Sequence, residues 1–149
     1  MIPVLVRDAV HDDISAIADI LMRSSRLAYT FMTWDHGDDD FTEFVRASFD
    51  DWDAARIAEA RRRVIGFHCL CGDVVDQLFV APEAQRHGVG SRLLRDVMAL
   101  RPTGFTLRTF RANRGARAFY EARGLVAISF GNSEEENEPD VTYRWSPLP

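Results

Sequence analysis

Apolar and polar positions change their period along the chain, and each change marks an expected element. Residues 4–9 begin with the apolar run Val-Leu-Val and read as a short opening strand. Residues 14–21 then place their apolar side chains on one helical stripe, behind Asp12 or Asp13 as the capping residue. Residues 41–49 repeat the helical spacing. The first third of the chain therefore predicts a strand followed by two helices.

Three short runs of alternating residues follow in quick succession. They cover residues 55–60, 63–70 and 74–80, and turn residues such as Gly72 and Asp73 separate them. Short turns join neighbouring strands in opposite directions, so we expect an antiparallel meander.

After Pro82 the period changes from two to 3.6, which predicts a long amphipathic helix. A strand over residues 105–110 and a short helix closed by Gly124 come next. The last two strands are expected at residues 125–130 and 141–145, on either side of an acidic loop. The order β-α-α-β-β-β-α-β-α-β-β predicts a mixed α/β fold.

Length and composition favour a single globular domain, residues 1–149, that works in the cytoplasm. Hydrophobic residues make up 46% of the chain, yet the longest apolar runs are too short to cross a bilayer. The first residues show no signal-peptide pattern. Cys69 and Cys71 lie too close along the backbone for an easy disulfide, and we interpret both as core thiols rather than zinc ligands.

Every basic side chain is an arginine, which excludes Schiff-base lysine chemistry and a phosphate loop of the lysine type. Between Asp8 and Asp53 there are twelve acids and three arginines, whereas between Arg86 and Arg123 there are nine arginines and two acids. The first region suits a cationic partner and the second an anionic one. Nucleic acid is not an expected partner, because the net charge is −5 and no reader motif occurs.

Gly88 and Gly90 stand at the start of the expected long helix, where each glycine costs about 1 kcal/mol relative to alanine. A helix N-terminus presents unpaired N–H groups and the positive end of the helix dipole, and together these bind phosphate. Glycine leaves room for a diphosphate to approach that backbone, and Ser91 adds a hydroxyl. The spacing matches neither a dinucleotide fingerprint nor a lysine-type loop. We therefore expect a phosphate site here.

The segment around these glycines resembles the central motif of the GNAT acyl-CoA-dependent acetyltransferases, Q/R-x-x-G-x-G/A. Gln85, Gly88 and Gly90 fall at its three defined positions. A second segment resembles the downstream motif of the same family at Asn113, Phe119, Tyr120 and Gly124. The expected order of strands and helices also resembles the GNAT fold.

The resemblance implies an acetyl-CoA site without a metal. Backbone groups of the fourth strand would hold the acetyl and pantetheine portion, and loop N–H groups would hold the pyrophosphate. The residues implied in binding acetyl-CoA are Leu78, Phe79, Val80, Gln85, Arg86, His87, Gly88, Val89, Gly90, Ser91, Asn113 and Arg117. Tyr120 would be the general acid that protonates the leaving thiolate. Asn113 also suits a helix cap, and Tyr120 a core aromatic.

Some members of this family hold a general-base glutamate five residues before the asparagine, where this chain has Arg108. Asp76 is the substitute that we prefer, because it alternates with apolar residues of its strand and such surroundings raise the pKa of a carboxyl. Glu59, His68 and deprotonation through water stay open as alternatives.

The loop after the first helix is the expected acceptor site, because aromatic and acidic side chains together hold organic cations. Its candidate residues are Tyr29, Phe31, Trp34 and Asp35. A solvated loop that covers the core is the alternative. The expected activity is acetyl transfer from acetyl-CoA to a primary amine by direct attack in a ternary complex. The competing interpretation is a non-catalytic acyl-CoA-binding or sensor domain. A homodimer through the late strands stays open, and no membrane partner is expected.

Overall fold

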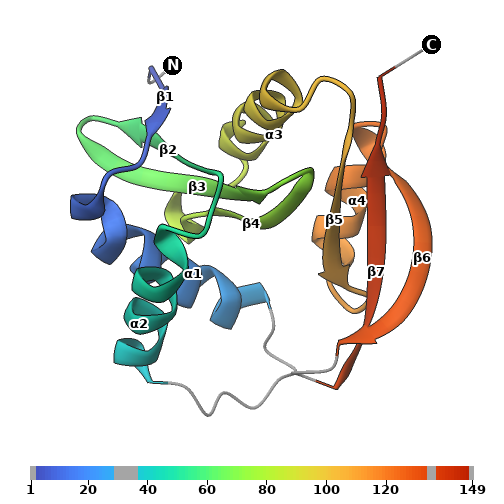
Figure 1. Cartoon of the computed structure of the whole chain (residues 1–149), viewed down its shortest axis with the longest axis horizontal. Helices are drawn as coiled ribbons and strands as arrows, with labels where there is room; N and C mark the ends of the chain where they lie inside the picture. Colours follow the sequence, from blue (N-terminus) through green and yellow to red (C-terminus); the bar gives the residue numbers. More distant parts are fainter. Residues whose placement is uncertain (1–2, 29–36, 134–136, 148–149) are drawn as a thin grey trace.

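A computed structural model describes residues 3–28, 37–133 and 137–147, which form one seven-stranded sheet with helices on both faces (Figure 1). The strands lie in the order β1-β2-β3-β4-β5-β7-β6. Along the chain the elements are β1 (Leu5–Asp8), η1 (His11–Asp13), α1 (Ile14–Ala28), α2 (Asp38–Phe49), β2 (Ala54–Ala60), β3 (Arg63–Cys71), β4 (Val74–Val80), η2 (Pro82–Ala84), α3 (Val89–Leu100), β5 (Phe105–Phe110), α4 (Arg114–Ala122), β6 (Val126–Ser133) and β7 (Glu138–Trp145). The expected order of α-helices and strands is confirmed.

The first four strands pair antiparallel, as the meander predicts, and they carry helices on both faces. α1 and α2 cover one face through a core that includes Ile17, Val45 and Phe67. α3 covers the other face, where Leu93 packs with Ala58. Successive strand residues point to opposite faces, so this arm of the sheet contributes to both cores.

β5, β7 and β6 form the second arm of the sheet, with α4 against one face (Figure 1). Leu107, Tyr120 and Tyr143 bring β5, α4 and β7 into one buried cluster. The last two strands are longer than expected, because residues 131–133 and 138–139, expected in the acidic loop, belong to β6 and β7, and Ser133 pairs with Glu138. Cross-strand pairing there outweighs the polar composition.

β4 and β5 join the two arms, and they pair over only two residue pairs. Val74 lies beside Thr106 and Val75 beside Leu107, in parallel. Beyond these pairs the two strands run in different directions (Figure 1). The facing edges of the two strands after these pairs, residues 76–80 of β4 and 108–110 of β5, are called the fork here. Backbone N–H and C=O groups on these edges have no partner in the neighbouring strand, which is unusual inside a sheet.

A β-bulge in β4 lies where the fork begins. Cys69 pairs with Gln77, but the next residue of β3, Leu70, pairs with Val75. Asp76 is therefore the extra residue of the bulge. Such a bulge bends its strand and increases the local twist, which fits the separation of β4 from β5 at this point.

Because of the bulge, the Asp76 side chain does not lie on the face of the sheet that the sequence predicts. Leu78 and Val80 pack under α3, on the face where we expected Asp76 as well. The Asp76 carboxylate instead accepts a hydrogen bond of 2.9 Å from Nε1 of Trp52, which belongs to the core beneath α1 and α2. The expectation of apolar surroundings is wrong because one extra residue shifts the period of two, and Asp76 is exposed.

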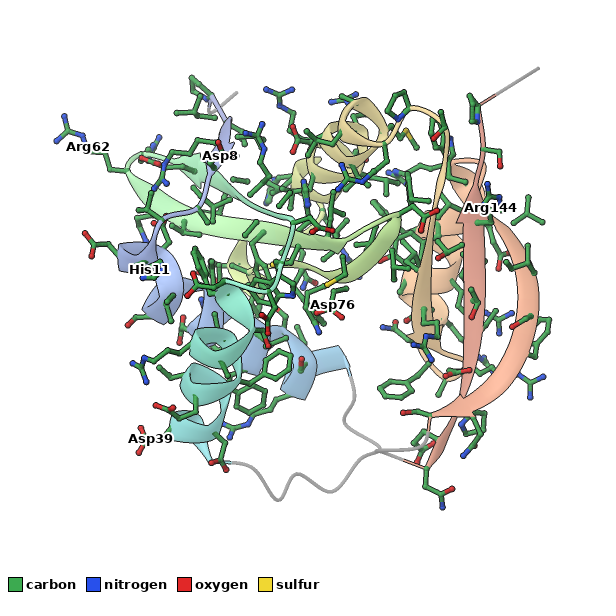
Figure 2. All side chains as sticks on the ribbon, in the orientation of Figure 1. Asp8, His11, Asp39, Arg62, Asp76 and Arg144 are labelled. Atoms are coloured by element: carbon green, nitrogen blue, oxygen red, sulfur yellow. The ribbon has the colours of Figure 1, made fainter. Side chains whose placement is uncertain are left out.

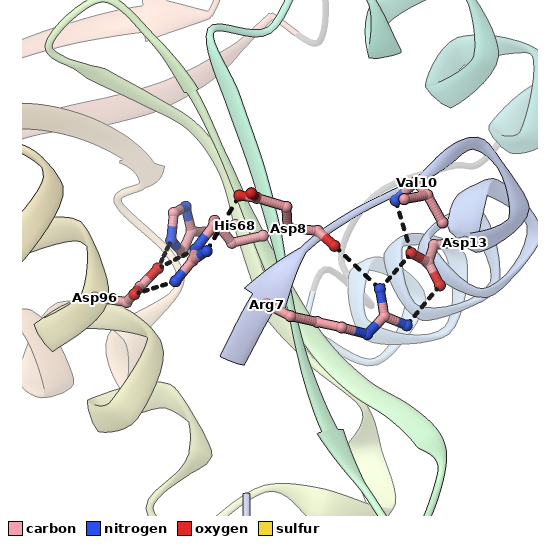
Figure 3. A network of polar contacts seen from close by, with 7 residues as sticks. Arg7, Asp8, Val10, Asp13, His68 and Asp96 are labelled. Carbon is pink, nitrogen blue, oxygen red and sulfur yellow. Dashed lines mark hydrogen bonds and ion pairs between the residues drawn. The ribbon is translucent and has the colours of Figure 1, made fainter. Parts of the chain in front are cut away.

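A polar network fastens α3 to the first arm (Figure 3). The Asp96 carboxylate accepts hydrogen bonds of 3.0 Å from Nε and Nη2 of Arg56, and lies 2.8 Å from Nε2 of the fully buried His68. Burial acts to raise the pKa of Asp96, but the hydrogen bonds from His68 and Arg56 outweigh burial and hold that pKa well below its usual range. Arg56 also reaches Asp8 of β1.

A second network fixes the start of α1 (Figure 3). The Arg7 guanidinium donates to both oxygens of Asp13, at 2.9 and 3.1 Å, and the Val10 N–H donates to the same carboxylate at 2.8 Å. These hydrogen bonds hold the pKa of Asp13 below its usual range, against the effect of burial. Asp13 is therefore the last residue of the short helix η1, and its carboxylate accepts the N–H of Val10, the N-cap residue of η1. It does not cap α1 as expected, because the chain makes one 3-10 turn first.

Candidate active site

The loop between β4 and α3 presents backbone N–H groups at the open end of the fork. The first hydrogen bond of α3 runs from Arg92 N–H to the Gly88 carbonyl, and no side chain caps the helix. The N–H groups before that bond are therefore unpaired within the helix. Arg86 and Gly88 are both left-handed, with φ of 67° and 84°. Alternation of right- and left-handed residues turns successive N–H groups inward and makes a concave anion site.

Gly88 and Gly90 of the motif are each required for a different structural reason. Gly88 needs its left-handed φ, and a Cβ there would meet nothing within 4 Å. Gly90 is helical, and a Cβ there would lie 3.2 Å from Cζ of Phe119 and 3.7 Å from Cγ2 of Val80. Gly90 thus lets α4 approach α3, a close contact that the sequence analysis did not foresee. Room for a diphosphate stays a separate expectation.

The edge of β4 points N–H groups into the fork. The Ala81 N–H donates to the Ile65 carbonyl at 2.8 Å, toward β3. Antiparallel pairing alternates, so the N–H groups of Leu78 and Val80 face the other way, toward the fork. The Phe79 side chain stacks on a β3 aromatic ring under α1.

The Val80 carbonyl, which also faces the fork, already has two donors. Oγ of Ser24 donates to it at 2.8 Å, and Nε2 of Gln85 donates at 3.1 Å. Ser24 is buried in α1, and sequence reasoning missed it. Its signal was a hydroxyl three residues after Leu21 on the apolar stripe of that helix.

α4 brings the second motif to the same region. Oδ1 of Asn113 accepts the Ala116 N–H at 3.1 Å, so the expected helix cap is confirmed. Tyr120 is 8% exposed, and its ring centroid lies 5.4 Å from Phe119 and 5.9 Å from Tyr143. The ring is a core aromatic by burial, and its role in chemistry stays an expectation.

Arg117, expected near a phosphate, is engaged within the protein. Its Nε donates to the Tyr143 hydroxyl at 3.1 Å, and that hydroxyl donates to the Glu121 carboxylate. Burial, and after it the contact with Glu121, raise the pKa of Tyr143. A phosphate would have to compete with Tyr143 for this guanidinium. Arg86 and His87, in the loop, are exposed.

Arg123 is a cation at the loop that the sequence analysis did not place there. Its Nε donates to Oγ of Ser91 at 2.9 Å, and its guanidinium lies 3.8 Å from the ring centroid of Phe119. The C-terminus of α4 thus supplies a positive charge beside the first turn of α3, where an anion would also feel the helix dipole.

Of the three side chains considered as a general base, only Asp76 lies at the fork. Glu59 accepts a hydrogen bond of 2.9 Å from Arg7 on the first arm. His68 is buried under α3, on the opposite face from the Trp52–Asp76 contact. Figure 2 shows Asp76 between the two arms of the sheet.

Acids gather near Asp76 at the end of β3. Cys71 ends that strand and is exposed, so the core interpretation holds for Cys69 and is wrong for Cys71. Burial first, and then the charges of Asp76 and Asp53, raise the pKa of the Cys71 thiol. Asp53 and Asp76 therefore lie near Cys71 at this end of β3.

The expected acceptor residues lie outside the described part of the chain, namely Tyr29, Phe31, Trp34 and Asp35. Within the residues that the structure describes, no group of three metal-binding side chains comes together. None of the described helices combines the length and the apolar character that crossing a membrane requires.

Residues 51–125, which include every element from β2 to α4, match the sequence model of the acetyltransferase (GNAT) domain. The chain belongs to the GNAT acetyltransferase family. Like its relatives it is an acetyltransferase, and the resemblance carried by the two motifs is confirmed at the level of family and fold.

Three known proteins resemble this GNAT chain over nearly its whole length. It is 25% identical to the peptidyl-lysine N-acetyltransferase YiaC of Escherichia coli K12 over 95% of this chain and 96% of that protein. The apo-form structure of YjaB from Escherichia coli superposes with a TM-score of 0.81 at 21% identity, over 95% of this chain and 97% of that one. The PaiA N-acetyltransferase of Thermoplasma acidophilum, in complex with coenzyme A, superposes with a TM-score of 0.74 at 16% identity, over 97% and 99%.

Proposed function

We propose that this GNAT acetyltransferase moves an acetyl group from acetyl-CoA to a primary amine by direct attack in a ternary complex. The fork, which leads to the uncapped N-terminus of α3, is the observation that carries the proposal. A CoA thioester carries an amide-bearing chain followed by a diphosphate. The fork offers strand N–H and C=O groups for the chain, and the helix start offers an anion site for the diphosphate. Coenzyme A in the PaiA structure supports this donor.

In the proposed complex the pantetheine chain adds to the edge of β4 as an extra strand would. The N–H groups of Leu78 and Val80 face it and would polarise the thioester carbonyl as charge develops on its oxygen. The diphosphate rests on the loop N–H groups between Arg86 and Ser91, with the Arg123 guanidinium beside it. The hydrogen bonds from Ser24 and Gln85 to the Val80 carbonyl position this edge. Phe79, Val89 and Asn113 are the further residues that would contact acetyl-CoA.

The chemical step requires one C–N bond to form and one C–S bond to break. The acceptor ammonium first gives a proton to the Asp76 carboxylate, or through water to the solvent. The neutral nitrogen attacks the thioester carbon, and collapse of the adduct expels the CoA thiolate. The Tyr120 hydroxyl protonates that thiolate and recovers a proton from the nitrogen, which becomes the amide. The products are an N-acetylated amine, the CoA thiol and one proton.

Replacing Tyr120 by Phe tests the assignment of the general acid. Loss of a positioned acid lowers turnover by a factor of about 100 or more, whereas the acetyl-CoA dissociation constant should change by less than about threefold. Turnover is followed by release of the CoA thiol, and affinity by calorimetry. Tyr143→Phe is the matched control, because it removes a buried hydroxyl from the same cluster. Equal turnover in the two variants would contradict the role of Tyr120.

A second candidate function is an acyl-CoA sensor, because Arg108 stands where some family members hold an acid. The same measurements separate the two candidates. A sensor binds acetyl-CoA at one site and releases no thiol with any amine, including lysine side chains of peptides, the acceptors named for YiaC. Acceptor-dependent thiol release would exclude the sensor.

A further inference from the structure

An acid and an arginine face each other across the start of the fork. The last parallel pair of β4 and β5 is Val75 with Leu107. The next residue on each strand is Asp76 on β4 and Arg108 on β5. Neighbouring strands lie about 4.8 Å apart while they are paired, so these two residues begin the fork at close range.

Both side chains lie on the same side of the sheet. Phe105, Leu107 and Thr109 of β5 are buried, the first two in the cluster that contains α4, so the alternating Arg108 points to the other face. Asp76 also lies on that other face, because its carboxylate contacts Trp52 in the core beneath α1 and α2. The acid and the arginine thus border one side of the fork.

These opposite charges are not paired with each other. Arg108 is exposed and makes no hydrogen bond or ion pair with any residue in the described part of the chain. The carboxylate of Asp76 accepts from Trp52, and its place in the bulge turns it toward that indole. An exposed arginine beside an acid would ordinarily close into a surface ion pair, which is worth little but forms readily. Here the Asp76 carboxylate bonds to Trp52 instead.

We infer that Asp76 and Arg108 select an acceptor that carries a carboxylate next to its reacting amine, as an α-amino acid does. The inference rests on the proposed function and names the substrate class for that site. Arg108 binds the carboxylate through two parallel N–H donors, and Asp76 binds the ammonium and takes its proton. An arginine without a carboxylate partner would repel an ammonium ion at this place. Its presence is therefore explained by an anionic group on the substrate.

The carboxylate has two sources that chemistry alone does not distinguish, the acceptor or a dicarboxylic acyl group on CoA. The nearby acid favours the acceptor, because an acyl carboxylate would not need Asp76 as its neighbour. A comparison of succinyl-CoA with acetyl-CoA separates the two sources experimentally.

The test uses the full chain with acetyl-CoA, the twenty standard amino acids and their carboxamides, which lack only the carboxylate charge. We expect kcat/KM for at least one amino acid to exceed that for its amide by about tenfold or more. Arg108→Gln should lower kcat/KM for the acid by a factor of about 10 to 100 and leave the amide nearly unchanged. Arg144→Gln is the control. Arg144 pairs with Thr106, two residues before Arg108, and so lies on the same face one strand away; it is labelled in Figure 2.

Several results would overturn the inference. These are an absence of turnover with every amino acid, an acid-to-amide ratio that Arg108→Gln leaves unchanged, and a preference for succinyl-CoA that Arg108→Gln abolishes. In each case, one-site acetyl-CoA binding and thiol release with a peptide lysine would leave the proposed function intact. A folded protein that does not bind acetyl-CoA would instead refute the proposed function, and the inference with it.

Discussion

Replacing Asp96 by Asn probes the network that holds α3 in place. The substitution keeps the size of the side chain but removes its charge, and one amide oxygen cannot accept from Arg56 and His68 as two carboxylate oxygens do. Breaking a buried ion pair costs about 3–5 kcal/mol. The Arg56 and Asp96 side chains are 22% and 15% exposed, so the pair is only partly buried. The expected loss of stability is therefore at the lower end of that range, about 3 kcal/mol.

Urea unfolding followed by Trp fluorescence measures this loss. With a urea m-value of about 1–3 kcal/mol/M, the midpoint of Asp96→Asn should fall by about 1–3 M at pH 7. The pKa of Asp96 is depressed in the folded state, so its stabilising effect is present above the unfolded pKa of about 3.9 and is lost as the pH falls below it. The difference between wild type and variant should be constant from pH 7 to about 5 and shrink toward pH 3.

Asp12→Asn is the matched control, because Asp12 is exposed and makes no ion pair within the described residues. This control should change the free energy of unfolding by less than about 0.5 kcal/mol. The anchoring of α3 by Asp96 would be refuted by a loss below about 1 kcal/mol at pH 7, or by a difference that does not shrink in acid.

Two further predictions concern the loop and the fork. Gly88→Ala should lower the free energy of unfolding in urea by about 1–2 kcal/mol, because the φ of Gly88 is left-handed. Gly90→Ala should leave that free energy nearly unchanged, because the gain in helix propensity is offset by the contact with Phe119. Equal losses of stability in the two variants would contradict this distinction. Asp76→Asn should lower the pKa of the Cys71 thiol and so speed its alkylation by iodoacetamide at pH 8, with the urea-unfolded protein as reference. An unchanged rate would show that the charge of Asp76 does not reach Cys71.

The order of the elements was predictable because long amphipathic stripes and short alternating runs differ in period, and tertiary packing did not override them. The uncapped start of α3 at the glycine loop and the cap at Asn113 were predictable for a similar reason, since both depend on local backbone chemistry. The full length of the last two strands was not predictable, because the register of Ser133 with Glu138 is a pairing between strands and leaves no mark in a polar stretch.

The candidate site was less accessible because its decisive contacts join distant segments. Alternation placed Asp76 on the wrong face, since a pattern of period two does not reveal an extra residue. The contact of Gly90 with Phe119 joins two helices, and the hydrogen bond of Ser24 joins α1 to β4. Each of these contacts results from packing between segments that are distant in the sequence. A single sequence does not reveal such packing.

The opening of the fork follows from how the two arms are packed rather than from the residues that border it. β4 pairs with β3 along its whole length, and β5 pairs with β7 over six residues, so each strand is held by its own arm. α3 lies close to β3 because Gly66 has no side chain, since a Cβ there would lie 3.0 Å from Cδ1 of Leu93. The Asp96 network also ties α3 to β3 through His68. With both arms satisfied internally, the twist at the Asp76 bulge is free to separate β4 from β5. The outer edges of β4 and β5 are paired with β3 and β7, so the N–H groups that the proposed function requires stay unpaired on the inner edges.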